Sequence, residues 1–384
     1  MMNNFSFSNS VKIIFGKGSI AKIAEEIPAD ARVLMTYGGG SIKKNGVYEQ
    51  VKKAMEGRVL FEFGGIEPNP HFETCMKAVE LCKKEKIDFL LSVGGGSVLD
   101  GTKLIAAAQF VEGDPWGILV EGKQPSNALP IGVVLTLPAT GSEMNSGAVI
   151  TKDATKEKRD FNSRLVLPKF SVLDPETTYS LPPRQIGNGV VDTFVHVAEQ
   201  YLTYPVGAKV QDRFAESILS VLVEEGPQAL KTPEDYEVRS NLMWASTWAL
   251  NGWISKGVPE DWATHMIGHE ITALYGLDHG QTLAIVLPGV LSVMRGEKGA
   301  KIMQMGERVF GVSEGDEASR IEQSIAKLEA FFVSMGVKTR LSDYGLAEDC
   351  IEPVVKRLAD RGVVLGENKT ITPEKVREIL KSRV

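Results

Sequence analysis

The 384-residue sequence predicts an α/β domain with a mostly parallel sheet, followed by an all-helical domain. Three observations support this. Apolar strands alternate with helical segments in the first half of the chain, and glycine runs close several of those strands. After Leu181-Pro182-Pro183 the strand pattern fades, because proline disfavours helix in the preceding residue and interrupts a sheet. We therefore expect one domain at residues 1–183 and a second at residues 184–384.

In the first domain, continuous apolar runs predict strands that are covered on both faces of a parallel sheet. The expected strands are residues 11–15, 32–37, 59–63, 87–93 and 131–137. Helical periodicity fills the segments between them, at residues 20–27, 47–55, 72–85 and 98–108. Strands that alternate with helices in this way are typical of a parallel sheet.

In the second domain, seven segments have the periodicity of long helices. They are residues 190–202, 213–225, 238–253, 262–274, 283–293, 302–310 and 321–335. The sequence contains no internal repeat of fixed period.

Composition excludes several classes of protein. The chain carries 43 Lys+Arg against 49 Asp+Glu, a formal net charge of −6 without a basic stripe, which argues against nucleic acid as a partner. No apolar run approaches the roughly 18 residues of a spanning helix, and the N-terminus lacks a signal-peptide pattern. Cys75, Cys82 and Cys350 lack metal-type spacing and are expected to be reduced and buried, which favours the cytoplasm.

The run Gly94-Gly95-Gly96-Ser97 lies between an apolar strand and a helix. Glycines allow close backbone approach there, and free N–H groups at a helix start suit a pyrophosphate. Asp100, one helical turn on, is placed to cap N–H groups or to touch a cofactor. The run departs from the G-x-G-x-x-G fingerprint, so an ordinary tight turn stays equally compatible with it.

A second run, Gly38-Gly39-Gly40-Ser41, also ends a strand. A site for NAD needs a carboxylate there to hold the ribose 2′-hydroxyl, but no acid lies between residues 36 and 47. Ser41, Lys43 and Lys44 suit a 2′-phosphate instead, which favours NADP, although a surface turn explains the spacing as well. The loop at residues 137–143 offers a further phosphate or nicotinamide contact, or only a helix cap.

The histidines are concentrated in the helical half. Asp192 and His196 are four residues apart, as are His265 and His269, so each pair shares a helix face. His265 and His279 would lie about 21 Å apart in one helix, so they can share a metal only if the chain turns at Gly276 or Gly280. One Asp and three His suit Fe(II), Zn or Ni, whereas the alternative is a set of satisfied core histidines. Trp262 precedes His265 by three residues and shares its helix face, where it either lines a substrate pocket or only packs against neighbouring helices.

These residues resemble the iron-containing, group III alcohol dehydrogenases, with all motifs in family order over essentially the whole chain. The motifs that carry the resemblance are Gly94 to Asp100, Thr136 to Glu143, Asp192 with His196, His265 with His269, and His279-Gly280. The resemblance implies an N-terminal Rossmann-like domain and a C-terminal helical domain, as in dehydroquinate synthase, with the site in the cleft between them. Segments 37–44 and 63–70 make the bacterial NADPH-dependent aldehyde reductases of the butanol dehydrogenase type the closest match.

The resemblance also implies roles for single residues. The implied metal ligands are Asp192, His196, His265 and His279, with His269 beside them as a proton relay. The implied coenzyme contacts are Gly38, Gly39, Gly40, Ser41, Lys43, Gly94, Gly95, Gly96, Ser97, Asp100, Thr136, Thr140 and Lys158. The metal is iron or zinc, and a homodimer is implied, with the edge strand at residues 11–15 as a possible contact.

The activity implied by the resemblance is the interconversion of small aldehydes and primary alcohols, such as butanal and butanol, with NADP(H) and one divalent metal. Three alternatives stay open: a glycerol-type polyol dehydrogenase, a lyase like dehydroquinate synthase, and a non-catalytic metal- or nucleotide-binding module. The lyase would need a Glu in place of Asp192 and basic residues around a phosphorylated sugar acid, whereas residues 192–279 are apolar and rich in Trp.

Overall fold

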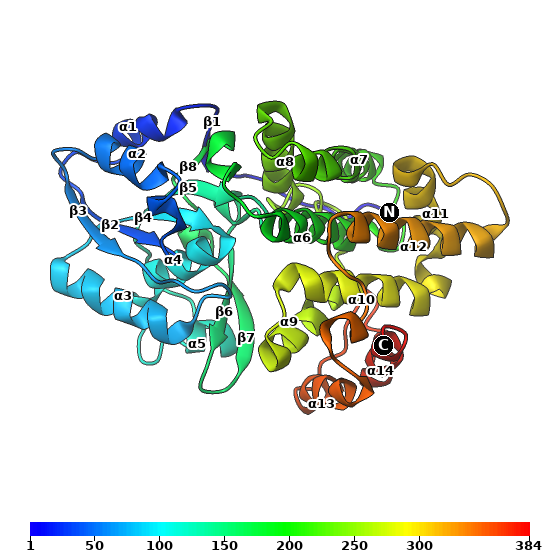
Figure 1. Cartoon of the computed structure of the whole chain (residues 1–384). Coiled ribbons are helices and arrows are strands. Elements are labelled where there is room, and N and C mark those ends of the chain that lie inside the picture. Colours follow the sequence, from blue (N-terminus) through cyan, green and yellow to red (C-terminus); the bar gives the residue numbers. More distant parts are fainter. The chain divides into compact units, whose positions relative to one another are not determined.

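The computed structural model describes residues 1–384, which form two compact units. The unit that we call the α/β unit comprises Ser8–Leu181 and Glu234–Thr247. The unit that we call the helical unit comprises Met1–Phe7, Pro182–Pro233 and Trp248–Val384. Figure 1 shows the elements of both along the chain.

The α/β unit contains a six-stranded sheet in which every neighbouring pair of strands is parallel, as predicted. The strand order is β1-β8-β5-β4-β2-β3. The strands are β1 (Lys12–Phe15), β2 (Arg32–Tyr37), β3 (Val59–Phe63), β4 (Phe89–Gly95), β5 (Ile131–Leu137) and β8 (Phe170–Leu173). All five predicted strands are present. The sequence pattern did not predict β8, which lies between β5 and the edge strand β1.

Helices cover both faces of this sheet, and alternate strand residues point into two separate apolar clusters. Leu34 and Leu90 belong to the cluster that includes α3 and α4, whereas Val33 and Leu91 belong to the cluster on the other face. The helices are α1 (Ile23–Glu26), α2 (Val47–Ala54), α3 (Phe72–Glu85), α4 (Gly96–Ala108) and α5 (Gly117–Val120). Burial on both faces explains why the strands are continuously apolar.

One predicted helix of this unit is partly wrong. Residues 20–27 form a 3-10 turn at Ser19–Lys22 followed by the single-turn helix α1. The helix stops because Ile27 is extended, with φ −98° and ψ 131°, and Pro28 follows it.

The unit also contains an antiparallel hairpin that the sequence pattern did not predict. It consists of β6 (Gly147–Lys152) and β7 (Glu157–Asn162), and β6 packs against α4. Helix α8 (Tyr236–Ala249) belongs mainly to the same unit. Its start is tied to the loop after β1, because the Tyr236 hydroxyl accepts a hydrogen bond from Lys17 N at 3.1 Å.

The helical unit is entirely α-helical apart from short 3-10 turns, which confirms the predicted class. Its helices are α6 (Pro183–Tyr201), α7 (Lys209–Lys231), α9 (Ala263–Tyr275), α10 (His279–Val293), α11 (Arg295–Phe310), α12 (Glu317–Ser334), α13 (Ile351–Asp360) and α14 (Pro373–Lys381). The sequence pattern did not predict the last two. None of the helices combines the length and the apolar character that crossing a membrane requires.

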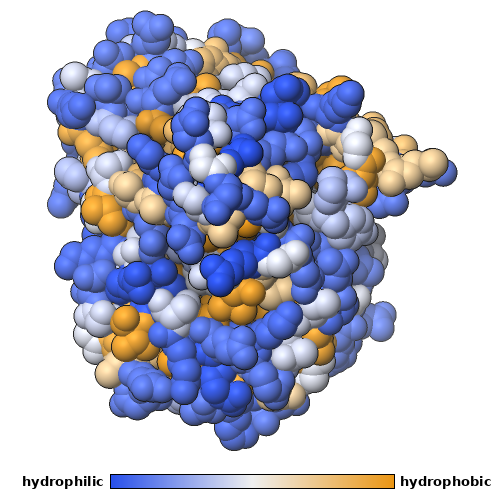
Figure 2. Space-filling model, turned by 90° about the vertical axis from the view of Figure 1, so that its right-hand side faces the viewer, coloured by the Kyte–Doolittle hydropathy of each residue, from blue (hydrophilic) through white to orange (hydrophobic).

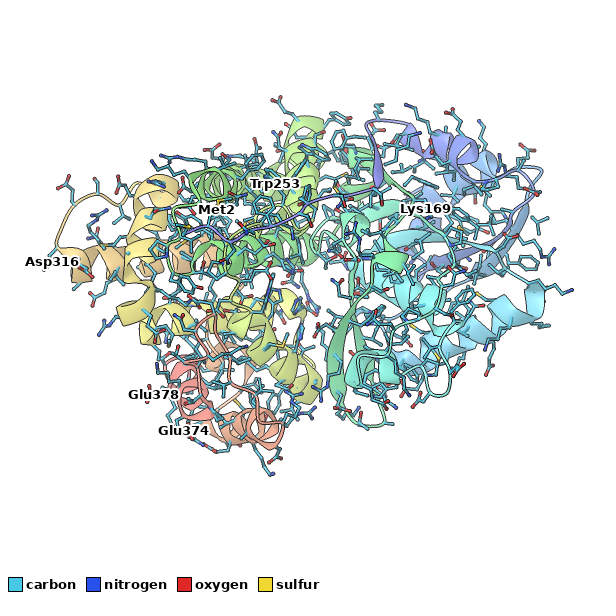
Figure 3. All side chains as sticks on the ribbon, turned by 180° about the vertical axis from the view of Figure 1, so that it is seen from behind. Met2, Lys169, Trp253, Asp316, Glu374 and Glu378 are labelled. Carbon is cyan, nitrogen blue, oxygen red and sulfur yellow. The ribbon has the colours of Figure 1, made fainter.

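The N-terminal segment lies along the helical unit, where Met2 and Trp253 are labelled in Figure 3. Asn3 N donates to the Gly257 carbonyl at 2.9 Å, and the Phe7 ring packs edge-on against Trp253 at 5.2 Å. The face shown in Figure 2 is mainly hydrophilic, with small separate hydrophobic patches. The three cysteines are free thiols and buried, as predicted.

Candidate active site

Three of the four predicted metal ligands, all histidines, surround a carboxylate oxygen of the fourth in the helical unit. Asp192 Oδ1 lies 3.4 Å from His196 Nδ1, 3.9 Å from His265 Nε2 and 3.6 Å from His279 Nε2. Donors about 2.1 Å from a tetrahedral ion lie roughly 3.4 Å from each other. The donor atoms of Asp192, His265 and His279 all fall within 4.8 Å of one another. The spacing of these three residues therefore fits one small divalent ion. His196 is not part of that group of three, although its Nδ1 is the imidazole nitrogen nearest to Asp192 Oδ1.

The chain turns between His265 and His279, as the spacing requires. Helix α9 ends at Gly276, which has φ 72°, and α10 begins at His279. Asp278 caps α10 and forms a capping box with Gln281, whose side chain accepts from Asp278 N at 3.0 Å. Arg184 of α6 holds the Asp278 carboxylate through two hydrogen bonds of 2.7 and 2.6 Å. His279 is thus fixed at the first position of a capped helix.

Gly280 allows α10 to start close to α6. A Cβ atom at this position would lie 2.7 Å from the carbonyl oxygen of Asn188. Any side chain would push the two helices apart and move His279 away from Asp192. The chain therefore turns at Gly276, whereas Gly280, the other predicted turn position, lies inside α10 and serves close packing.

A buried acid behind His265 escaped the sequence reasoning. Glu199 of α6 is 4% exposed, and its Oε2 accepts a hydrogen bond from His265 Nδ1. Burial raises the pKa of Glu199, and the nearby His265 ring opposes that shift. Burial alone would lower the pKa of His265, but the Glu199 and Asp192 carboxylates outweigh it, and the pKa rises to about 9. With no cation bound, these carboxylates thus favour the protonated form of His265. The sequence pattern does indicate Glu199 as a candidate site residue, since it follows His196 by three residues in an apolar helix and therefore shares its face.

His269 and Trp262 lie beside the cluster. The His269 ring centroid is 5.3 Å from that of His279 and 6.1 Å from that of His265. The Trp262 ring packs edge-on against His265 at 5.4 Å. The remaining histidine, His71, is in the α/β unit, where its Nδ1 lies 2.8 Å from Asp153 Oδ2.

In the α/β unit, the β4–α4 turn has the form expected of a phosphate loop. Helix α4 begins at Gly96, and no side chain caps its first N–H groups. A Cβ atom on Gly96 would lie 2.4 Å from Thr140 Oγ1, and one on Gly95 would lie 2.9 Å from Leu137 Cβ. The glycines therefore bring the turn after β4 against the loop after β5, where Thr140 is located.

Asp100 lies in a buried polar network below this turn. Its Oδ1 accepts from Ser142 Oγ at 2.6 Å, and its Oδ2 accepts from Val149 N at 2.9 Å. Lys103, which sequence reasoning missed, is 0% exposed and donates to Ser142 Oγ at 2.8 Å. Lys103 also donates to the carbonyl oxygens of Asn145 and Gly147, at 2.9 and 2.7 Å. Both oxygens of Asp100 thus bond to the protein.

Burial sets the titration of this network. It raises the pKa of Asp100 and lowers that of Lys103 to about 8, while each of the two charges opposes the shift of the other. The sequence pattern could have indicated Lys103, because it is the only charged residue after Asp100 in an otherwise apolar helix.

Lys158 on β7 and Ser97 are brought together through Asn69. Lys158 Nζ donates to Asn69 Oδ1 at 2.9 Å, and Asn69 N donates to Ser97 Oγ at 3.3 Å. Asn69 has φ 54°, a conformation that Asn adopts more readily than most residues. Thr136, another predicted coenzyme contact, is buried at the end of β5.

The Gly38 run forms an open turn after β2. A Cβ atom on Gly39 would meet nothing within 4 Å, and Gly40 has φ 92°. Ser41 is exposed, and Lys43 Nζ lies 4.9 and 5.0 Å from the ring centroids of Tyr37 and Tyr48. The aromatic rings hold the Lys43 ammonium beside the turn through cation–π contacts.

An acid of the neighbouring strand β3, outside residues 36–47, also lies near this turn. Glu62 accepts a hydrogen bond from the Tyr48 hydroxyl at 2.8 Å and pairs with Lys52 at 3.3 Å. Although burial raises the pKa of Glu62, hydrogen bonds from Tyr48 and Lys52 outweigh it, and the net shift is downward.

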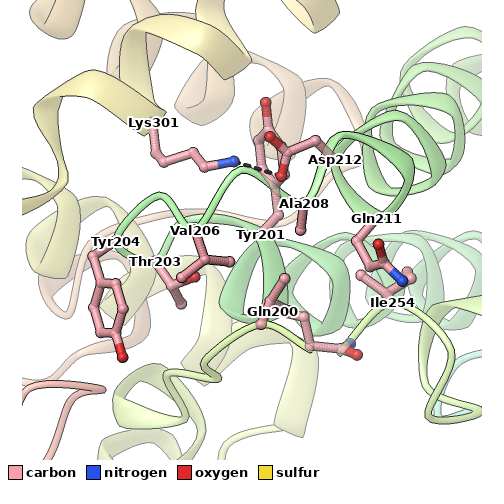
Figure 4. A pocket seen from close by; sticks show the side chains of 11 residues that line it. Gln200, Tyr201, Thr203, Tyr204, Val206, Ala208, Gln211, Asp212, Ile254 and Lys301 are labelled. Atoms are coloured by element: carbon pink, nitrogen blue, oxygen red, sulfur yellow. Dashed lines mark hydrogen bonds and ion pairs between the residues drawn. The ribbon is translucent and has the colours of Figure 1, made fainter. Parts of the chain in front are cut away.

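Figure 4 shows a separate pocket of the helical unit, on α7, α11 and the end of α6. Lys301 Nζ lies in it, 2.6 Å from Asp212 Oδ1 and 4.4 Å from the centre of the Tyr201 ring. No predicted site residue lines this pocket.

Comparison with known proteins covers nearly the whole chain. Residues 10–175 match the family model for iron-containing alcohol dehydrogenase, and residues 187–384 match its C-terminal model. The chain is 58% identical to the NADPH-dependent aldehyde reductase YqhD of Escherichia coli, covering 98% of this chain and 99% of the relative. It is 43% identical to a probable NADH-dependent butanol dehydrogenase of Bacillus subtilis, covering 99% of this chain and 100% of that relative.

The crystal structure of Escherichia coli K-12 YqhD superimposes with a TM-score of 0.98 at 56% identity. The match covers 100% of this chain and 99% of that chain.

Proposed function

The chain belongs to the iron-containing alcohol dehydrogenase family, and from that premise we propose that it reduces small aldehydes to primary alcohols with NADPH. The reverse reaction oxidises alcohols such as butanol. Relatives whose names specify aldehyde reductase or butanol dehydrogenase support this substrate class. The observation that carries the proposal is the set of three imidazole nitrogens around Asp192 Oδ1, in which only His279 is not fully buried.

These donors fit a divalent metal. Oxygen and imidazole ligands suit iron or zinc, and the separations of 3.4–3.9 Å from Asp192 Oδ1 match donors around one ion. We propose that Asp192, His196, His265 and His279 hold it. When bound, the metal polarises the carbonyl oxygen and stabilises the alkoxide, while the coenzyme supplies the hydride.

The side chains around the cluster prepare the site for this chemistry. The capped start of α10 fixes His279, and burial of Asp192 and His265 excludes water from the donors. We assign His269 as the proton relay, because its ring lies beside those of His265 and His279 and is 4% exposed. An imidazole exchanges protons near neutral pH, which suits delivery of a proton to the product oxygen.

We further propose that the coenzyme is NADP(H) and that residues 1–183 form its domain, with residues 184–384 as the metal-binding domain. The uncapped start of α4 supports a pyrophosphate contact at Gly94, Gly95, Gly96 and Ser97. Asp100, Thr136, Thr140 and Lys158 surround this turn in the proposal. The two relatives carry different coenzymes in their names, so the choice is argued from residues of this chain.

The residues that favour NADP over NAD are at the turn after β2. We propose that Gly38, Gly39, Gly40 and Ser41 let the ribose approach, and that Lys43 binds the 2′-phosphate. Open space over Gly39 supports the approach, and the ammonium of Lys43 lies against two rings rather than against a carboxylate.

The proposed assembly is a cytoplasmic homodimer. Strand β1 is hydrogen-bonded on one side only, by β8, and exposed strand edges invite pairing. Phe15 of β1 and Trp244 are both about 40% exposed and pack edge-on at 5.9 Å. Light scattering should give twice the monomer mass, whereas a monomer at micromolar concentration would contradict the dimer.

The activity is tested by following NADPH consumption with a panel from propanal to hexanal, on protein of measured metal content. We expect turnover with butanal and a kcat/KM for NADPH above that for NADH. Turnover of glycerol with no reduction of any aldehyde would identify a polyol dehydrogenase instead. A tenfold preference for NADH would contradict the role of Lys43.

A further inference from the structure

We propose that Glu199 is a positioning residue that sets the tautomer and the direction of His265 for metal binding. The inference rests on the proposed metal site but concerns a residue outside the ligand set. Three independent contacts of the Glu199 side chain and backbone support it, and each belongs to the helical unit.

The first contact is between Glu199 and the ring of His265. Asp192, His196 and Glu199 follow one another at spacings of four and three residues, so they share one face of α6. Glu199 is 66 residues from His265 in sequence, yet its Oε2 accepts from Nδ1 of that ring. One helix thus supplies two proposed ligands and the carboxylate behind a third.

This contact decides which nitrogen faces the cluster. To bind a metal, His265 must be in its neutral form, which has one N–H and one lone pair. Because a carboxylate can only accept, Nδ1 carries the proton in that form. The lone pair then belongs to Nε2, which makes no hydrogen bond and lies 3.9 Å from Asp192 Oδ1. Histidine ligands generally donate their other N–H in this way, and losing the acceptor costs about 10–100-fold in metal affinity or activity.

The second contact is between Glu199 and the start of α9. Its Oε1 accepts from the backbone N–H groups of Thr264 at 2.6 Å and His265 at 3.4 Å. These are among the first N–H groups of the helix, which have no partner within it. The two oxygens of Glu199 therefore fix both the position of the helix that carries His265 and the rotation of its ring.

The third contact joins the backbone of Glu199 to the residues just before α9. The Glu199 carbonyl accepts from Asp261 N at 2.9 Å, and Asp261 Oδ1 accepts from Ala263 N at 2.8 Å. Buried Lys298 lies 2.8 Å from Asp261 Oδ2 and 2.8 Å from Glu367 Oε2. Because Asp261 also caps α9, the helix keeps a partner for its first turn when Glu199 is changed.

The substitution Glu199→Gln separates the two roles of the side chain. A glutamine oxygen can still accept from Thr264 and His265 N–H, but the amide nitrogen then faces Nδ1 and cannot accept its proton. We expect Zn²⁺ affinity, measured by chelator competition, to fall about 10–100-fold. The absorption spectrum of the Co²⁺-substituted protein should also change, because the direction of one ligand changes. The melting temperature of the metal-free protein should change little.

The matched control is Glu270→Gln. Glu270 is a buried carboxylate on the same helix, next to His269, but it pairs with Arg357 at 2.6 Å and with Arg361 rather than with a proposed ligand. We expect this variant to melt at a lower temperature than the unchanged protein. Its Zn²⁺ affinity should stay within threefold of the affinity of the unchanged protein. Equal losses of affinity in both variants, in step with stability, would show a structural role only and overturn the proposal.

Retention of Zn²⁺ affinity within threefold by Glu199→Gln would also overturn it. Failure of the unchanged protein to bind Zn²⁺ or Co²⁺ would instead refute the proposed metal site, and this inference with it. If Glu199→Gln does not fold, proton NMR of the unchanged Co²⁺ protein decides. A paramagnetically shifted N–H proton that exchanges slowly with water is expected for His265, and fast exchange of every such proton would contradict the proposal.

Discussion

The proposed metal site of the helical unit and the glycine turns of the α/β unit are built from different parts of the chain. The cluster consists of side chains, with Asp192 and three imidazoles at separations of 3.4–3.9 Å. The turns consist of backbone, where Gly96 packs against Thr140 and Gly39 faces open space. A site of side chains loses its chemistry with one substitution, whereas a backbone site should weaken by degrees that depend on the room for a Cβ atom.

The largest effect should come from removing one side chain of the cluster. His279→Ala removes a proposed ligand, and a metal supplies several kcal/mol of stabilisation to developing charge, so kcat/KM should fall about a thousandfold or more. Bound metal, measured by inductively coupled plasma mass spectrometry, should fall in parallel. His71→Ala is the control, because His71 pairs with Asp153 in the other unit and should keep both properties.

A smaller effect is expected where side chains support the backbone turn. Lys103→Met removes the donor that serves Ser142, Asn145 and Gly147, and it leaves Asp100 without its buried countercharge. Breaking a buried charge pair from one side costs about 3–5 kcal/mol. Urea denaturation should show that loss, whereas Lys44→Met on the exposed turn should leave stability unchanged. A loss below 1 kcal/mol would mean that the network is not coupled to folding.

The pair Gly96→Ala and Gly39→Ala separates packing from coenzyme approach. A Cβ on Gly96 would lie 2.4 Å from Thr140 Oγ1, and overpacking of this kind costs about 1–3 kcal/mol. A Cβ on Gly39 meets no protein atom within 4 Å. We therefore expect Gly96→Ala to unfold more easily, and Gly39→Ala to fold normally but to raise KM for NADPH. An unchanged KM in Gly39→Ala would remove this turn from the coenzyme site.

The smallest effect concerns the choice of coenzyme. Lys43→Ala should lower the ratio of kcat/KM for NADPH to that for NADH about tenfold, since one charge-assisted contact to the 2′-phosphate is lost. Lys44→Ala is the comparison, because the sequence pattern offered both lysines for the phosphate, whereas the ring contacts hold Lys43 beside the turn. Equal changes in both variants would reflect net charge rather than a specific contact.

The strands of the fold differ in how well they could be predicted from the sequence. Continuous apolar strands such as β4 and β5 were visible because both faces of the sheet are covered. Strand β7 escaped prediction because Glu157–Asn162 is rich in charge. Strand β8 also escaped, although it is no shorter than the predicted strand β1. Their pairing depends on partners that periodicity along the chain does not reveal.

Within the site, histidine spacing revealed the cluster because few other residue types do the same chemistry. Glu199, Lys103 and Asn69 were missed because their roles arise from partners 66, 39 and 89 residues away in sequence. Asp100 was predicted beside the coenzyme turn, and the structure adds that both of its oxygens bond to Ser142 and Val149. Tertiary contacts of this kind follow from the fold and not from local pattern.

Metal titration of the metal-free protein tests the central claim most directly. Zn²⁺ or Fe²⁺ is added in steps, and reduction of butanal by NADPH is measured at each step together with bound metal. The account predicts negligible activity without metal, and a rise that reaches its plateau at one ion per chain. Full activity in the metal-free protein would contradict it. So would a His279→Ala variant that gains activity and binds metal just as the unchanged protein does.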